Sequence, residues 1–112
     1  MKRKSIMLFL GLIFFSSNVF SISLVDLWGR RYANAKDIKE KREIVLSLTK
    51  RVNAEYEPLI LDILKDMSLY IPDGNPQNYR YYEDVVYYVA DMMIKLNIKK
   101  NSDDLILMYK KM

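Results

Sequence analysis

The segment from Tyr81 to Leu96 reads YYEDVVYYVADMMIKL, and the architecture expected for the whole chain follows from it. On a helix its apolar positions form one stripe, because successive members lie four, three, four and three residues apart. These positions are Tyr82, Val86, Val89, Met93 and Leu96. The charged residues Asp84, Asp91 and Lys95 lie on the opposite side. A stripe this wide has to be covered by other helices, so the sequence predicts an all-α fold.

Two earlier segments show the same helical periodicity. Apolar residues recur on one face between Asp37 and Val52, and either Asn34 or Asp37 is suited to cap the start of that helix. A second stripe follows between Pro58 and Tyr70, with Pro58 in the first turn, where its missing N–H is harmless. Because the connection between them is short, we expect these two helices to lie antiparallel and to bury their stripes together.

The clearest break in the chain is Ile71–Pro76, which contains two Pro, one Gly and an Asn-Pro step. After this break, the helix that carries residues 81–96, which we call the organising helix, is expected to begin near Asn78 or Tyr79 and to end around Asn97. The final segment, Leu105 to Tyr109, is apolar nearly all round. We expect it either to dock deeply into the core or to lack something that covers it.

These segments predict about four helices in residues 34–112. They are expected to form two antiparallel helix pairs, in a solenoid-like arrangement or a small bundle. Residues 22–33 precede them as an N-terminal docking segment. Within it, Leu27 and Trp28 are expected to cap one end of the core, and the alternative is that they anchor a partner.

Residues 1–21 have the layout of a secretory signal peptide. Three basic residues at positions 2–4 precede an apolar run from Ile6 to Phe15, and the residues before Ser21 suit cleavage after it. The run is shorter than the ~20 apolar residues of a membrane-spanning helix. We therefore expect export to a bacterial periplasm or to the outside of the cell. The alternative is an uncleaved signal that anchors the chain in the inner membrane.

The charge balance does not support a nucleic-acid function. The chain has 18 basic and 14 acidic residues, a net charge of +4. Removal of residues 1–21 takes away three basic and no acidic residues, which leaves 15 against 14, or +1. The basic excess therefore belongs largely to the targeting segment, and we expect no nucleic-acid partner. The chain also has no Cys and no His, which excludes disulfides, thiol catalysis and the usual nucleophile–base pairs.

One short pattern occurs twice in the chain. Tyr56-Glu57-Pro58-Leu59-Ile60 and Tyr82-Glu83-Asp84-Val85-Val86 match at a distance of 26 residues. Together with the order of helices and turns, this pattern resembles HEAT-type or armadillo-type helical repeats, in which each helix pair buries its face against the next. The resemblance covers residues 34–112, about two pairs. It implies a protein-binding scaffold or a fragment of one, and it transfers no site residue to this chain.

Asp62 and Asp66 are four residues apart and so share one helix face. Such a pair suits a metal site or an acid and a base in a small enzyme or ligand-binding domain. Isolated carboxylates on a helix are usually solvated, and we interpret these two in that way. The three glycines, Gly11, Gly29 and Gly74, form no phosphate-binding loop. We therefore expect no catalytic residue, no metal site and no cofactor.

Tyrosine is concentrated at the start of the organising helix, where it fills five of the ten positions from 79 to 88. Tyr82 and Tyr88 are assigned to the core by their spacing. The remaining residues of this group, Tyr79, Arg80, Tyr81 and Tyr87, are predicted to contact another protein, because exposed Tyr and Arg are enriched at interfaces. For the tyrosines as a group, core packing is the first interpretation, ahead of a protein interface, and the stacking of a ligand on their rings also stays open. The sequence thus favours an exported, non-enzymatic protein-interaction module, with a membrane-tethered envelope protein as the alternative.

Overall fold

The computed structural model describes residues 23–111, which form five α-helices and one short 3₁₀ turn. The helices are α2 (Leu24–Ala33), α3 (Ile38–Thr49), α4 (Glu57–Leu69), α5 (Pro76–Lys95) and α6 (Ser102–Lys111), and the turn η1 is Ala54–Tyr56. The all-α prediction is confirmed, since the described residues contain no strand. The predicted signal peptide and its cleavage site lie outside the described residues. Within residues 23–111, no helix combines the length and apolarity that crossing a bilayer requires.

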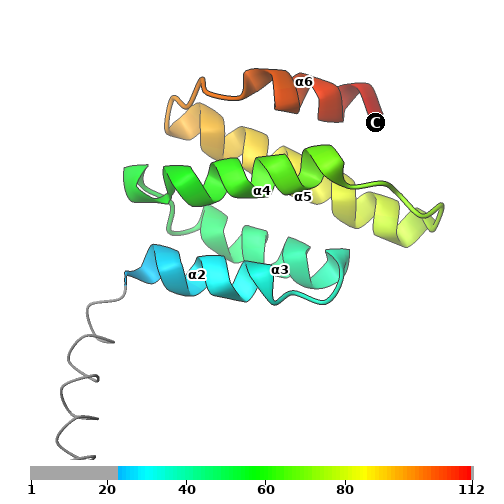
Figure 1. Ribbon diagram of the computed structural model, residues 1–112, viewed down its shortest axis with the longest axis horizontal. Helices are drawn as coiled ribbons and strands as arrows, with labels where there is room; N and C mark the ends of the chain where they lie inside the picture. Colours follow the sequence, from blue (N-terminus) through cyan, green and yellow to red (C-terminus); the bar gives the residue numbers. More distant parts are fainter. Residues whose placement is uncertain (1–22, 112) are drawn as a thin grey trace, which may run out of the picture.

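The longest helix, α5, lies at the centre of the arrangement. It packs most extensively against α3 and also contacts α4 and α6. In turn, α4 packs against α6, and α2 packs against α3. Figure 1 shows α4 crossing in front of α5, with α2 at one end of the stack and α6 at the other. This corrects the expected pairing of α3 with α4, because the stripe of α4 is covered by α5 and α6.

One hydrophobic core joins all five helices. The fully buried side chains include Leu48 of α3, Leu64 and Met67 of α4, and Tyr82 of α5. Trp28 of α2 belongs to the same cluster and is only 9% exposed. The segment expected to dock onto the domain is therefore a helix with its own share of the core, and Trp28 covers one end of that core.

The start of α5 lies at Pro76, two residues before the earliest predicted position. The Asn75 side chain accepts hydrogen bonds from the backbone N–H groups of Gln77 and Asn78, at 2.9 and 3.2 Å. Pro76 takes the first helical position, where no N–H is needed. The second proline of the predicted break is thus already part of the helix.

The end of α5 is a left-handed turn at Asn97, whose φ is 55°. The Ile98 N–H donates to the carbonyl of Met93 at 2.8 Å, and the Asn97 N–H donates to that of Ile94 at 3.1 Å. These two bonds form a Schellman motif, for which an Asn in the left-handed region is well suited. The turn leads the chain into α6, which packs back against α4 and α5.

The last helix is only half covered. Met108 is fully buried and Leu105 is partly buried against the core. Ile106 and Leu107 are each 51% exposed, and Tyr109 is 44% exposed. Of the two expectations for this segment, deep docking therefore applies to one side of α6 alone.

The buried hydroxyl of Tyr82 yields a prediction. Within the described residues this hydroxyl has no hydrogen-bond partner, and the ring stacks on Tyr70 with 5.1 Å between centroids. Burial raises the pKa of Tyr82, so the hydroxyl stays protonated. We expect Tyr82→Phe to leave the free energy of unfolding unchanged or to raise it by about 1 kcal/mol, because an unpaired buried hydroxyl is destabilising. Urea denaturation measures the difference, and a loss above about 1 kcal/mol would show that the hydroxyl does have a partner.

Candidate functional site

A surface hollow of about 380 Å³ lies where the side chains of α3 and α5 meet. It is lined by Arg42, Gln77, Arg80, Tyr81, Glu83, Asp84 and Tyr87, and we call it the Tyr–Arg hollow. All of these residues except Arg42 belong to α5. The hollow therefore lies along the organising helix, on the side that α3 borders.

Arg42 is the residue that ties α3 to this part of α5. Its Nε donates to the Asp84 carboxylate at 2.6 Å, and its Nη1 donates to Glu43 at 3.0 Å. The guanidinium carbon also lies 5.9 Å from the centre of the Tyr81 ring. The hydrogen bond to Asp84 raises the pKa of Arg42 above its usual value. The hollow thus contains a fixed cation, already paired, against which the Tyr81 ring is held.

Three of the four residues predicted to contact a partner come together in this hollow. Arg80 and Tyr87 are exposed, Tyr87 by 51%, and Tyr81 is partly buried beside Arg42. Tyr79 lies elsewhere. It is partly buried against the core, with its ring 6.3 Å from that of Tyr82. For Tyr79, core packing, which the sequence left open as an alternative, describes the position in the structure.

Sequence reasoning did not single out the other four residues of the hollow, which are Arg42, Gln77, Glu83 and Asp84. Arg42 and Asp84 form the ion pair of this hollow, and the sequence pattern placed Asp84 only on the side opposite the apolar stripe. They lie 42 positions apart, and only the packing of α3 on α5 brings them within hydrogen-bonding distance. No local pattern in the sequence predicts the ion pair between these two residues.

The structure gives different surroundings to Asp62 and Asp66. One Asp66 oxygen accepts a hydrogen bond from the Tyr32 hydroxyl at 2.6 Å and from Lys41 Nζ at 2.7 Å. Burial, followed by this hydrogen bond, raises the pKa of Tyr32, which keeps the hydroxyl a donor. Asp66 therefore joins α4 to α2 and α3. Asp62 is exposed, and no ion pair is formed by it within the described part of the chain.

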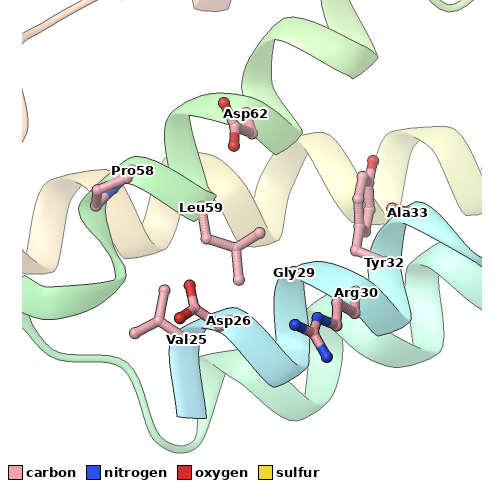
Figure 2. Close-up of a pocket in the computed structure, with 9 residues that line it drawn as sticks. All are labelled: Val25, Asp26, Gly29, Arg30, Tyr32, Ala33, Pro58, Leu59 and Asp62. Atoms are coloured by element: carbon pink, nitrogen blue, oxygen red, sulfur yellow. The ribbon is translucent and has the colours of Figure 1, made fainter. Parts of the chain in front are cut away.

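A second hollow, of about 480 Å³, is the groove between α2 and α4. Its floor is largely apolar, with Val25 from α2 and Pro58 and Leu59 from α4. Figure 2 shows Asp26 beside Leu59 and Asp62 on the next turn of α4, whereas Arg30 points away from α4. Its charged groups do not converge on one point, so the groove offers no common binding point for a charged ligand.

Comparison with known proteins adds no relative. No family model matches the chain, and neither a curated protein nor a solved structure matches it. Among residues 23–111, acidic side chains form no group of three or more that could hold a metal ion. The Tyr–Arg hollow and the α2/α4 groove are two sites in the described residues that can be interpreted functionally.

Proposed function

We propose that this chain is an exported, non-enzymatic helical interaction module that contacts another protein through the Tyr–Arg hollow. The observation that carries the proposal is the gathering of Arg80, Tyr81 and Tyr87 in one hollow. Exposed arginine and tyrosine contribute more binding energy than most residue types at protein interfaces. A partner side chain that enters the hollow would meet the Tyr81 ring, already held beside Arg42, and the exposed guanidinium of Arg80.

Pre-organisation favours a binding role for this hollow. The ion pair between Arg42 and Asp84 restricts two of its side chains before any partner arrives, so less conformational entropy is lost on binding. Helices two apart in the chain pack on each other, α3 on α5 and α4 on α6, which favours the solenoid-like arrangement of the HEAT-type resemblance. In such arrays, binding surfaces run across neighbouring repeats, as the hollow does between α3 and α5.

The second candidate is a membrane-tethered envelope protein. It rests on the apolar run in residues 6–15 and on its extension toward Val25, which gives enough length for an uncleaved anchor. N-terminal sequencing of the exported protein distinguishes the two candidates. A chain that starts at Ile22 excludes the anchor, and one that starts at Met1 excludes cleavage.

Photo-crosslinking tests the proposed contact surface. A photoreactive residue at position 87 should form an adduct of one defined mass in the exporting cell, and the adduct identifies the partner. The purified pair should then lose about tenfold or more in affinity when Arg80 and Tyr87 are both changed to Ala, because each is expected to contribute on the order of 1 kcal/mol.

The matched control uses α6, at the far end of the stack. Tyr109 and Lys110 are exposed there, and their double change to Ala removes one aromatic ring and one cation, as the test variant does. This control should keep full affinity. Equal crosslinking from positions 87 and 109, or equal affinity of the two double variants, would contradict the proposed surface.

A further inference from the structure

The outer end of the stack at α2 combines exposed leucines with unpaired arginines. Leu24 is 60% and Leu27 is 45% exposed. Helical spacing places both on one side of α2 together with Arg31 and the edge of Trp28. Val25, Asp26 and Gly29 take the other side and line the groove toward α4. We call Leu24, Leu27, Trp28, Arg31 and Arg51 the α2 end face.

Two guanidinium groups lie over the indole ring of this face. The Cζ atoms of Arg31 and Arg51 are 4.9 and 5.1 Å from the centre of the Trp28 ring. Both arginines are exposed, and in the described residues neither forms an ion pair. Lys50, next to Arg51, adds a further exposed cation. The face therefore carries positive charge that the protein itself does not neutralise.

Two acidic side chains, one on α2 and one on α3, lie or bond away from this face. Asp26, the only acidic residue of α2, lies on the groove side of the helix. Glu40, at the start of α3, accepts a hydrogen bond from the backbone N–H of Lys36 at 2.8 Å. Neither one compensates the guanidinium groups on Trp28.

From these observations we propose that the α2 end face seats the protein on an anionic lipid bilayer, a role beyond the contact made by the Tyr–Arg hollow. Leucine and arginine beside a tryptophan are typical of interfacial helices. Here the exposed leucines would enter the headgroup region and the arginines would meet lipid phosphates, while Trp28 lies buried beneath them. A cation held over an aromatic ring keeps its charge while its aliphatic stem lies against apolar surface.

The position of this face in the chain favours a bilayer over an acidic protein as the occupant. The apolar run in residues 6–15 follows three basic residues and ends shortly before Ser23, where the described chain begins. A segment of this composition is directed to a membrane. The α2 end face is the part of the folded domain closest to it in sequence. In the proposed export, the chain contacts the membrane through residues 6–15. Binding of the α2 end face to lipid would continue this contact.

Trp28 is the only tryptophan of the chain, so its fluorescence reports on this face alone. The probe is a set of vesicles of phosphatidylcholine with about one third phosphatidylglycerol, in which brominated lipids quench nearby indole emission. The protein is used as the exporting cell produces it. We expect strong quenching of Trp28 in these vesicles and weak quenching in vesicles of phosphatidylcholine alone. A chain that keeps residues 1–21 attaches to both kinds of vesicle, and the difference in Trp28 quenching still reports the seating of α2.

Charge reversal isolates the electrostatic contribution to vesicle binding. Arg31→Glu combined with Arg51→Glu should lower partitioning to the anionic vesicles by about tenfold or more, since each basic residue near an anionic surface contributes roughly fivefold. The control reverses two exposed lysines, Lys99 in the connection before α6 and Lys110 on α6, and changes the net charge by the same amount. Partitioning of this control should stay within about twofold of the unmodified protein.

The apolar contribution to vesicle binding is tested by a double variant, Leu24→Ser with Leu27→Ser. This variant should show less Trp28 quenching in both kinds of vesicle. Both leucines are exposed, so circular dichroism should show an unchanged fold. Equal quenching of the unmodified protein in neutral and anionic vesicles would overturn the proposal, and so would an equal loss in the two charge-reversed variants. Binding to an acidic protein without any vesicle quenching would assign the face to a protein partner instead.

Discussion

Leu64→Ala is expected to lower the free energy of unfolding by about 3 kcal/mol, because the removal of a fully buried leucine side chain leaves a cavity. Leu64 lies in the core on α4, the helix that contacts both α5 and α6. A domain of this size has a total stability on the order of 5–10 kcal/mol, so the variant should lose a large part of it. Urea denaturation followed by circular dichroism measures the shift.

The same helix supplies the control for this prediction. Leu69 is 67% exposed at the end of α4, and Leu69→Ala makes the same chemical change. Its cost should stay within about 0.5 kcal/mol, because little apolar surface is taken from a packed environment. If the two variants were equally stable, α4 would not be buried through Leu64 in the way the structure describes.

Asp66→Ala is expected to lower the free energy of unfolding by about 2–3 kcal/mol. The change leaves the buried Tyr32 hydroxyl without its acceptor and removes the partner of Lys41. Most of the loss should come from Tyr32, since Asp66 is 39% exposed at its side chain and solvent weakens its ion pair with Lys41. Chemical denaturation at neutral pH measures it.

Asp62→Ala provides the comparison, one turn earlier on the same helix. Asp62 is exposed, so its replacement should change the stability by no more than about 0.5 kcal/mol. A double-mutant cycle between Tyr32→Phe and Asp66→Ala should give a coupling energy of about 1–2 kcal/mol. Additive effects in this cycle would mean that the short contact between the two side chains contributes nothing to stability.

These two results would establish what holds the two ends of the molecule to its centre. Leu64 tests the apolar packing that α4 shares with its neighbours, and Asp66 tests the polar junction of α2, α3 and α4. The proposed contact surfaces lie outside both. Losses of function in the Tyr–Arg hollow or at the α2 end face can therefore be separated from losses of fold.

Helix formation was largely predictable, because it depends on neighbouring residues. The Asp37 carboxylate caps α3 by accepting the Glu40 N–H at 2.9 Å, as one of the two proposed caps. Pro58 lies in the first turn of α4, again as expected. The start of α5 was placed too late, since the sequence pattern treated Pro76 as part of the break. Its fixed backbone suits the first helical position as well as a loop.

The helical character of residues 24–33 was harder to predict. Gly29 interrupts the apolar pattern there, and glycine inside a helix costs about 1 kcal/mol relative to alanine. Burial of Trp28 and Tyr32 against the other helices, together with the Ser23 cap, outweighs this cost. Tertiary contacts thus stabilise a fifth helix where the sequence predicted only a docking segment.

The candidate site could be predicted only partly from the sequence. Local crowding of tyrosine and arginine singled out Arg80, Tyr81 and Tyr87, which lie in one hollow. The same crowding singled out Tyr79, whose ring lies against the core instead. Arg42 and Asp84, the pair that orders this hollow, come from helices far apart in sequence.

Periodicity and capping act within a few residues, so the all-α class, the ends of several helices and the apolar face of α5 could be predicted from the chain. Only the folded molecule shows that α3 packs on α5, that Asp66 joins three helices and that the arginines of the α2 end face form no ion pair. An apolar stripe has to be buried, but its pattern does not specify against which of several similar stripes. That choice depends on how all five helices fill one core together.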